Sequence, residues 1–155
     1  IKMVQDIIER PLVLENVSYY ITPLNELSEL EFTLAVIKES GCKLLLDVNN
    51  VYVNSINHGY NAEHFIKAMP SDAIVYGHIS GHYDEADDLK VDTHGADVIK
   101  PVWNLLELAY QEHGVFPTLL ERDFNIPAID VLLQEVMKIK TIQAKYHTNV
   151  EGVAE

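Results

Sequence analysis

The chain has 155 residues, 48% of them apolar, which is about the length of one domain. Its 24 Asp and Glu against 11 Lys and Arg give a formal charge of −13, which argues against a nucleic-acid partner, because such binding rests on cations that neutralise phosphates. The single Cys42 excludes an internal disulfide and favours a reducing compartment, and no apolar run reaches a membrane span, so we expect a cytoplasmic protein without a membrane partner.

Four short apolar runs along the chain predict strands, and their unbroken apolar character indicates burial on both faces. They are Leu12–Leu14, Lys43–Leu46, Ala73–Tyr76 and Thr118–Leu120. A helical pattern follows each run before the next one begins. The order strand, helix, repeated four times, predicts a parallel sheet in a single α/β domain over residues 1–155.

The helix ends carry recognisable capping residues. Ser28 and Glu31 form a capping box for a first helix that Gly41 ends, and a shorter helix runs from Asn61 to Met69. Asp97 caps a helix that has Pro101 in its first turn and ends at Gly114. Asn125 with Pro127 opens the last helix.

Four βα units make half of a (β/α)8 TIM barrel, since a whole barrel needs about 250 residues. A small open sheet with helices on both faces is the alternative. Neither a Gly-rich phosphate loop nor the G-x-G-x-x-G fingerprint is present, so the half barrel is favoured. An isolated half leaves strand edges unpaired. The chain begins at Ile1, and we expect the remaining four strands upstream, outside this chain.

A metal-ligand type of residue follows each predicted strand. These residues are Glu15, Asp47, His78 and Glu121. Any one of them alone is explained equally well as a helix N-cap or a strand-end salt bridge. Because the carboxyl ends of barrel strands converge on one mouth, four such residues at equivalent positions favour a common site.

A second group lies in the long loop from Ser80 to Ala96. Its acidic run predicts a solvated loop without a role, and it then continues as Asp92-Thr93-His94. Alternate residues of an extended segment point the same way, so Asp92 and His94 can grip one ion. Oxygen and imidazole ligands without thiolate fit zinc, iron or manganese. Two or more ions that share a bridging carboxylate would explain the number of ligands.

The combined motifs resemble a known family. They are Leu14-Glu15-Asn16-Val17-Ser18, Leu46-Asp47-Val48-Asn49-Asn50, Asn57-His58-Gly59, Gly77-His78-Ile79-Ser80-Gly81-His82, Asp92-Thr93-His94-Gly95 and Glu121-Arg122-Asp123. They resemble the multinuclear non-haem iron-dependent oxidative enzymes of the MbnB/TglH type (UPF0276), within the xylose-isomerase-like barrels. The ligand order is also similar to the trinuclear site of endonuclease IV, in which a histidine stands at the position of Asn50.

The resemblance implies that this chain is the C-terminal half of the barrel, strands five to eight. It implies two or three iron ions, with Glu15 bridging two of them. Asp47, His78 and Glu121 would complete the coordination of the second ion. The third ion would be held by Asn50, Asp92 and His94. Two histidines from the earlier strands would complete the first. Members modify cysteines of a ribosomally made peptide with dioxygen, in natural-product biosynthesis, after a partner protein presents the peptide.

Further residues near the mouth each have two candidate roles. Asp123 is a candidate general base or a partner of Arg122, and His82 is a candidate for orienting ligands or contacting substrate. His58 has the same candidate role or is a turn residue that bonds its own backbone. Tyr19 and Tyr20 are candidates for lining a substrate groove or for packing. We expect three further histidines on helical segments to be surface residues: His64, His113 and His147.

The leading hypothesis is therefore an iron-dependent oxidoreductase that acts on a cysteine-containing peptide. A metal-dependent hydrolase or isomerase on the same barrel, such as an abasic-site endonuclease or a sugar isomerase, is the alternative. A half barrel that serves only as a binding or assembly module is a third, from a different class.

Overall fold

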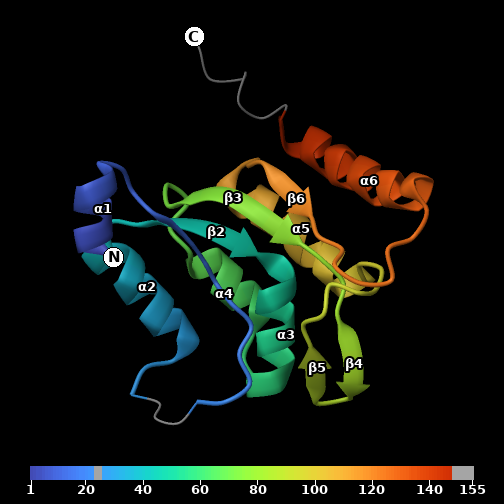
Figure 1. Ribbon diagram of the computed structural model, residues 1–155, viewed down its shortest axis with the longest axis horizontal. Helices are drawn as coiled ribbons and strands as arrows, with labels where there is room; N and C mark the ends of the chain where they lie inside the picture. Colours follow the sequence, from blue (N-terminus) through green and yellow to red (C-terminus); the bar gives the residue numbers. More distant parts are fainter. Residues whose placement is uncertain (23–25, 148–155) are drawn as a thin grey trace.

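The fold is organised by a four-stranded parallel sheet, in a computed structural model that describes residues 1–22 and 26–147 (Figure 1). Its order is β1-β2-β3-β6. The strands are β1 (Val13–Glu15), β2 (Lys43–Asp47), β3 (Ile74–Ile79) and β6 (Thr118–Leu120). Strand order and parallel pairing confirm the predicted βα repeat, and the arrangement is that of half a (β/α)8 barrel.

Helices precede, connect and follow the strands of this sheet. They are α1 (Lys2–Ile8), α2 (Glu29–Ser40), α3 (Val48–His58), α4 (Ala62–Ala68), α5 (Lys100–His113) and α6 (Ile129–His147). The core lies where α3, α4 and α5 pack together beneath the two inner strands. Leu46 and Ile79 of the sheet, with Phe65 and Leu106 of the helices, are fully buried there. None of the helices in the described ranges is both long and apolar enough to cross a membrane.

Burial differs between the inner and the outer strands. In the inner strands β2 and β3, Leu44, Leu46 and Ile74 are buried, as predicted, but Val75 is 37% exposed. In the outer strands Val13 and Leu119 are each 46% exposed, so the prediction of burial on both faces is wrong for β1 and β6. Both strands lie at edges of an open sheet, and a closed barrel would give each of them a further neighbour.

Capping explains where two of the helices begin. Ser28 and Glu31 form the predicted capping box of α2, which ends at Gly41 in the left-handed conformation with φ 69°. Asn61 caps α4 by accepting a hydrogen bond from the backbone N–H of His64. The helix predicted from Asn61 to Met69 is therefore present, with the two predicted end residues as its caps.

The predicted starts of the last two helices are wrong. Helix α5 has Ile99 as its N-cap without a side-chain cap, because the Asp97 carboxylate instead accepts a hydrogen bond from Arg122 at 2.6 Å. Helix α6 begins at Ile129, beyond Asn125, whose side-chain amide donates to the backbone carbonyl of Gly95. Each of these polar side chains binds a partner elsewhere in the fold and therefore does not cap its helix.

The sequence patterns do not predict helix α1, helix α3 or the hairpin after β3. Helix α3 follows β2 without a loop, because Asp47 is at once the last residue of the strand and the N-cap of the helix. The supposed solvated loop after β3 contains a hairpin, β4 (Tyr83–Ala86) and β5 (Leu89–Val91). The acidic side chains of the hairpin are exposed, as expected, and one of them, Asp84, forms an ion pair with Lys90 at 3.0 Å.

The core position of Leu46 makes a first prediction. Leu46→Ala removes a fully buried side chain directly before Asp47 and should lower the free energy of unfolding by about 2–5 kcal/mol. Urea denaturation followed by circular dichroism measures this. The matched control is Leu133→Ala, at a side chain that is 53% exposed on α6, which should change stability by less than about 0.5 kcal/mol. Equal effects of the two substitutions would contradict the assigned core.

Candidate metal centre

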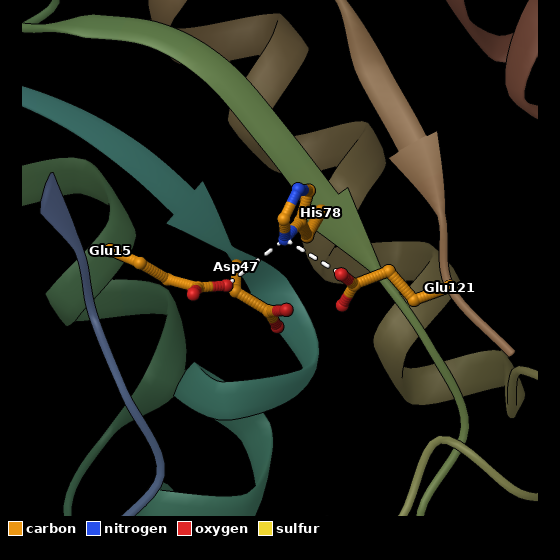
Figure 2. Close-up of side chains that lie close together, drawn as sticks. All are labelled: Glu15, Asp47, His78 and Glu121. Carbon is orange, nitrogen blue, oxygen red and sulfur yellow. Dashed lines mark hydrogen bonds and ion pairs between the residues drawn. The ribbon is translucent and has the colours of Figure 1, made fainter. Parts of the chain in front are cut away.

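Four side chains from the four strand ends converge at the carboxyl edge of the sheet (Figure 2). Glu15, Asp47, His78 and Glu121 each offer one ligand atom, and these atoms lie within 4.8 Å of one another. His78 lies between two of the carboxylates: its Nδ1 is 3.0 Å from Glu15 and 3.2 Å from Glu121. The convergence predicted from the strand ends is thus present, and this group could hold a metal ion.

Asp47 has two tasks at once. One carboxylate oxygen, Oδ1, accepts a hydrogen bond of 2.7 Å from the backbone N–H of Asn50 and so caps α3. The other, Oδ2, is buried and accepts no hydrogen bond from any described residue. A buried carboxylate oxygen without a donor is costly in apolar surroundings, and a cation held by the cluster would compensate it.

Asn16 holds the backbone of Asp47 in place. Its side-chain amide donates to the Asp47 carbonyl and accepts from the Asp47 N–H, both at 2.9 Å. Both groups are buried, so the two hydrogen bonds are well shielded from water. Strand β1 pairs with β2 only as far as Leu45, opposite Glu15, and the Asn16 side chain continues that pairing beyond it.

The electrostatics of the cluster favour a cation. Burial, with smaller contributions from the nearby carboxylates of Asp92, Glu15 and Glu121, raises the pKa of Asp47 to about 7 against the lowering effect of the Asn50 N–H. Burial also raises the pKa of Glu121, although His78 and His94 oppose this. A divalent ion among these groups would offset both the burial and the repulsion. The donor set, carboxylates with one imidazole, fits iron, zinc or manganese.

A second group adjoins the first through Glu121. His94 places its Nδ1 3.5 Å from Glu121 and 3.2 Å from Asp123, and its Nε2 lies 2.9 Å from Asp92. Interaction with the Asp92 carboxylate raises the pKa of His94 to about 9 against the opposing effect of burial. Asp92 and His94 converge as predicted, but not through an extended segment. His94 has φ 50°, a left-handed conformation that a non-glycine residue adopts only under constraint.

Asn50 lies against the same site from the first turn of α3. Its side-chain N–H donates to the backbone carbonyl of Asn16 at 3.0 Å, whereas its Oδ1 is buried and accepts nothing from the described residues. An amide oxygen in this state can serve as a ligand atom. The geometry therefore leaves Asn50 available as a ligand.

His82 lies deeper than predicted. It is 6% exposed, and its Nδ1 lies 2.7 Å from the side-chain oxygen of Asn49. The Asn49 amide nitrogen donates to the Asp92 carboxylate at 3.0 Å, which fixes the amide orientation and requires His82 to donate from Nδ1. Burial lowers the pKa of His82, so the neutral ring is favoured. Single-sequence reasoning assigned nothing to Asn49, which links His82 to the site.

The other predicted residues divide into those near the site and those away from it. Asp123 lies beside His94 and not in a pair with Arg122, which binds Asp97 and Glu135 instead. His58 donates from its Nε2 to the Tyr19 carbonyl, 2.8 Å away, so it does not bond its own turn. Those on helices away from the cluster are His64 and His147, both exposed, and His113, which bonds Ser71 and Ile66.

Comparison with known proteins identifies the family. Residues 1–144 match the RiPP precursor modification enzymes MbnB/TglH/ChrH, where RiPP denotes a ribosomally synthesised and post-translationally modified peptide. The chain belongs to this family. Its resemblance to the MbnB/TglH-type enzymes is thereby confirmed.

Several similar proteins carry only the name UPF0276 protein. One from Shewanella loihica is 66% identical over 145 residues, 94% of this chain and 52% of that protein. One from Nitrosospira multiformis is 57% identical over 147 residues, and one from Pseudomonas aeruginosa is 52% identical over 145. These alignments cover 94% of this chain in both cases, with 52% and 51% of the respective relatives. The chain therefore spans about half the length of the curated relatives that it matches.

The double task of Asp47 gives a second prediction. Asn caps helices as well as Asp does, so Asp47→Asn keeps α3 and removes only the charge that faces the cluster. Affinity for Fe²⁺, measured by calorimetry under nitrogen, should fall at least about tenfold, with an unchanged circular dichroism spectrum. Asp72→Asn, at the opposite end of the sheet just before β3, is the matched control and should bind Fe²⁺ as the parent chain does.

A third prediction separates the two nitrogens of His82. Asn at this position can reproduce the Nδ1–H that reaches Asn49, whereas Gln places its amide where Nε2 lies. We expect His82→Gln to weaken Fe²⁺ binding by about tenfold or more through disorder at Asp92, and His82→Asn to keep most of the affinity. Equal losses in both variants, at equal thermal stability, would show that His82 acts otherwise.

Proposed function

We propose that the protein is an iron-dependent oxidative enzyme that modifies cysteine residues of a ribosomally made peptide with dioxygen. The observation that carries the proposal is the convergence of Glu15, Asp47, His78 and Glu121 at the strand ends of a chain from the MbnB/TglH/ChrH family. Membership in a family of peptide-modifying enzymes supports the substrate class. The oxygen and nitrogen donors support iron but fit zinc and manganese as well.

The proposed ligands divide into two adjoining groups. Glu15, Asp47, His78 and Glu121 would hold one ion and share the bridging Glu15 with another. Asp92, His94 and Asn50 would hold a further one, against Glu121. Iron bound there would supply the redox chemistry with dioxygen. Three carboxylates of the first group, the buried Asp47, the half-buried Glu121 and the exposed Glu15, would balance the charge of the ions.

Asp123 is the proposed proton acceptor. Its side chain is 66% exposed and lies beside His94, so it can reach both solvent and a substrate group at the site. A cysteine thiol or a peptide N–H that reacts here must lose its proton, and a carboxylate at the rim can accept it. His82 is proposed to position Asp92 through Asn49 and not to touch the substrate.

The whole protein would supply what this half lacks. The exposed outer strands β1 and β6 each offer an unpaired edge, and the relatives are about twice as long. We therefore propose that four further strands close the barrel, and that two of their histidines complete an ion site at Glu15. The proposal also includes a partner protein that presents the peptide, and a reducing, cytoplasmic setting that keeps the buried Cys42 as a thiol.

The fourth prediction tests the reaction on the full-length protein. Metal analysis should find two or three iron ions per chain, and incubation with a cysteine-containing precursor peptide should change the peptide mass only when oxygen is present. Glu121→Gln should reduce this turnover at least about tenfold. The isolated 155-residue chain should bind fewer ions and show no turnover.

Other outcomes would favour the alternatives. Bound zinc with oxygen-independent cleavage or isomerisation would replace the oxidative enzyme with a hydrolase or isomerase on the same barrel. An intact biological function after Glu15→Ala would indicate a binding or assembly module, because no metal chemistry would then be needed.

A further inference from the structure

A large cavity adjoins the metal cluster on the side of β1. It measures about 810 Å³ and lies between the segment that follows β1, the first turns of α2 and the end of α3. Glu15 belongs both to the metal cluster and to the wall of this cavity. A molecule that fills the cavity would therefore extend directly to the reacting centre. The size is that of a site for a small molecule or for one or two residues of a peptide.

Aromatic rings form part of the wall. The Tyr19 ring stacks on the His58 ring with centroids 4.0 Å apart and planes inclined by 9°. The hydrogen bond between His58 and the Tyr19 backbone fixes this stack. Tyr60 and the exposed Phe32 add two further rings to the lining. Such walls present flat π faces to whatever occupies the cavity.

The permanent charges of the described lining residues have one sign, although the wall also contains His58, whose imidazole interacts electrostatically with Glu29. Glu15, Glu26 and Glu29 line the cavity, and no Lys or Arg is among its described lining residues. Glu29 is half-buried and accepts a hydrogen bond from Asn54 at 3.0 Å, yet forms no ion pair with a Lys or Arg in the described part of the chain. The helix N-terminus of α2 does not offset this negative charge, because the Glu31 carboxylate already accepts the Ser28 backbone N–H there in the capping box.

We propose that this cavity binds a cationic side chain of the peptide substrate, with a guanidinium as the best fit. That the occupant belongs to a peptide rests on the proposed function. That it is a cation rests on the residues that line the cavity. Carboxylates and aromatic faces together bind cations, and a planar guanidinium can pair with the first while it stacks on the second. An arginine close in sequence to the modified cysteine would then anchor the peptide at the metal cluster.

The ionisation of the wall is consistent with a missing cation. Burial raises the pKa of Glu29. Burial and the neighbouring Glu29 carboxylate raise the pKa of Tyr19 to about 12. Both shifts mean that negative charge is disfavoured at this place, and a bound guanidinium would stabilise the Glu29 carboxylate.

The test uses a pair of ligands that differ only in charge. Nα-acetyl-arginine amide and the uncharged Nα-acetyl-citrulline amide are titrated into the metal-free 155-residue chain at matched chloride concentration, followed by amide chemical shifts in NMR spectra. The arginine compound should cause saturable shifts at Thr33 and Tyr60, and the citrulline compound should bind at least about fivefold more weakly. Glu26→Gln and Glu29→Gln should each weaken arginine binding, whereas Glu63→Gln, exposed on α4, should not.

Contrary results are equally defined. Equal binding of the two compounds, the absence of saturable shifts at the cavity, or undiminished binding in both cavity variants would overturn the inference. Glu26 is exposed, so its variant remains informative if Glu29→Gln does not fold. Because no metal is present, failure here leaves the iron-dependent reaction standing, and failure of iron binding leaves the cation site standing.

Discussion

The pair of hydrogen bonds between the Asn16 side chain and the Asp47 backbone is the constraint on which the site depends. It fixes the end of β2 against the end of β1, and thereby the separation of Asp47 from Glu15. It also fixes the point at which α3 begins, since Asp47 caps that helix. The remaining ligand-type residues then follow from strand pairing, because His78 lies opposite Asp47 in the sheet and Glu121 follows directly on β6.

Negative charge is concentrated around two imidazoles. The two groups meet at Glu121, which approaches both His78 and His94. Protonated imidazoles can balance only part of the surrounding carboxylate charge, and the buried Asp47 carboxylate is the one least exposed to water. A protein that keeps such a group has a use for positive charge at that place. The neighbouring cavity continues the same negative surface away from the cluster, through Glu29.

The sequence allowed the strands and four convergent ligand-type residues to be predicted, because position relative to a buried strand is a strong constraint in parallel sheets. It did not reveal α3, since asparagine is a weak helix former and three of the residues from Val48 to Asn54 are asparagines. Hydrogen bonds from Asn16 or Asn49 to groups more than 30 positions away leave no local pattern. The assumed caps at Asp97 and Asn125 failed for a related reason, because local propensity does not report a tertiary partner.

The shared carboxylate of Asp47 also bears on how chemistry can be lost within such a fold. Asparagine has a side-chain oxygen that can cap α3, but its amide group carries no charge. Exchange of Asp47 for asparagine therefore removes a ligand charge and preserves the helix. A single-residue change would thus remove the charge that faces the cluster and leave an intact scaffold with its neighbouring cavity. Family members with asparagine at this position would be expected to keep the fold and the cavity without the charged group that faces the cluster.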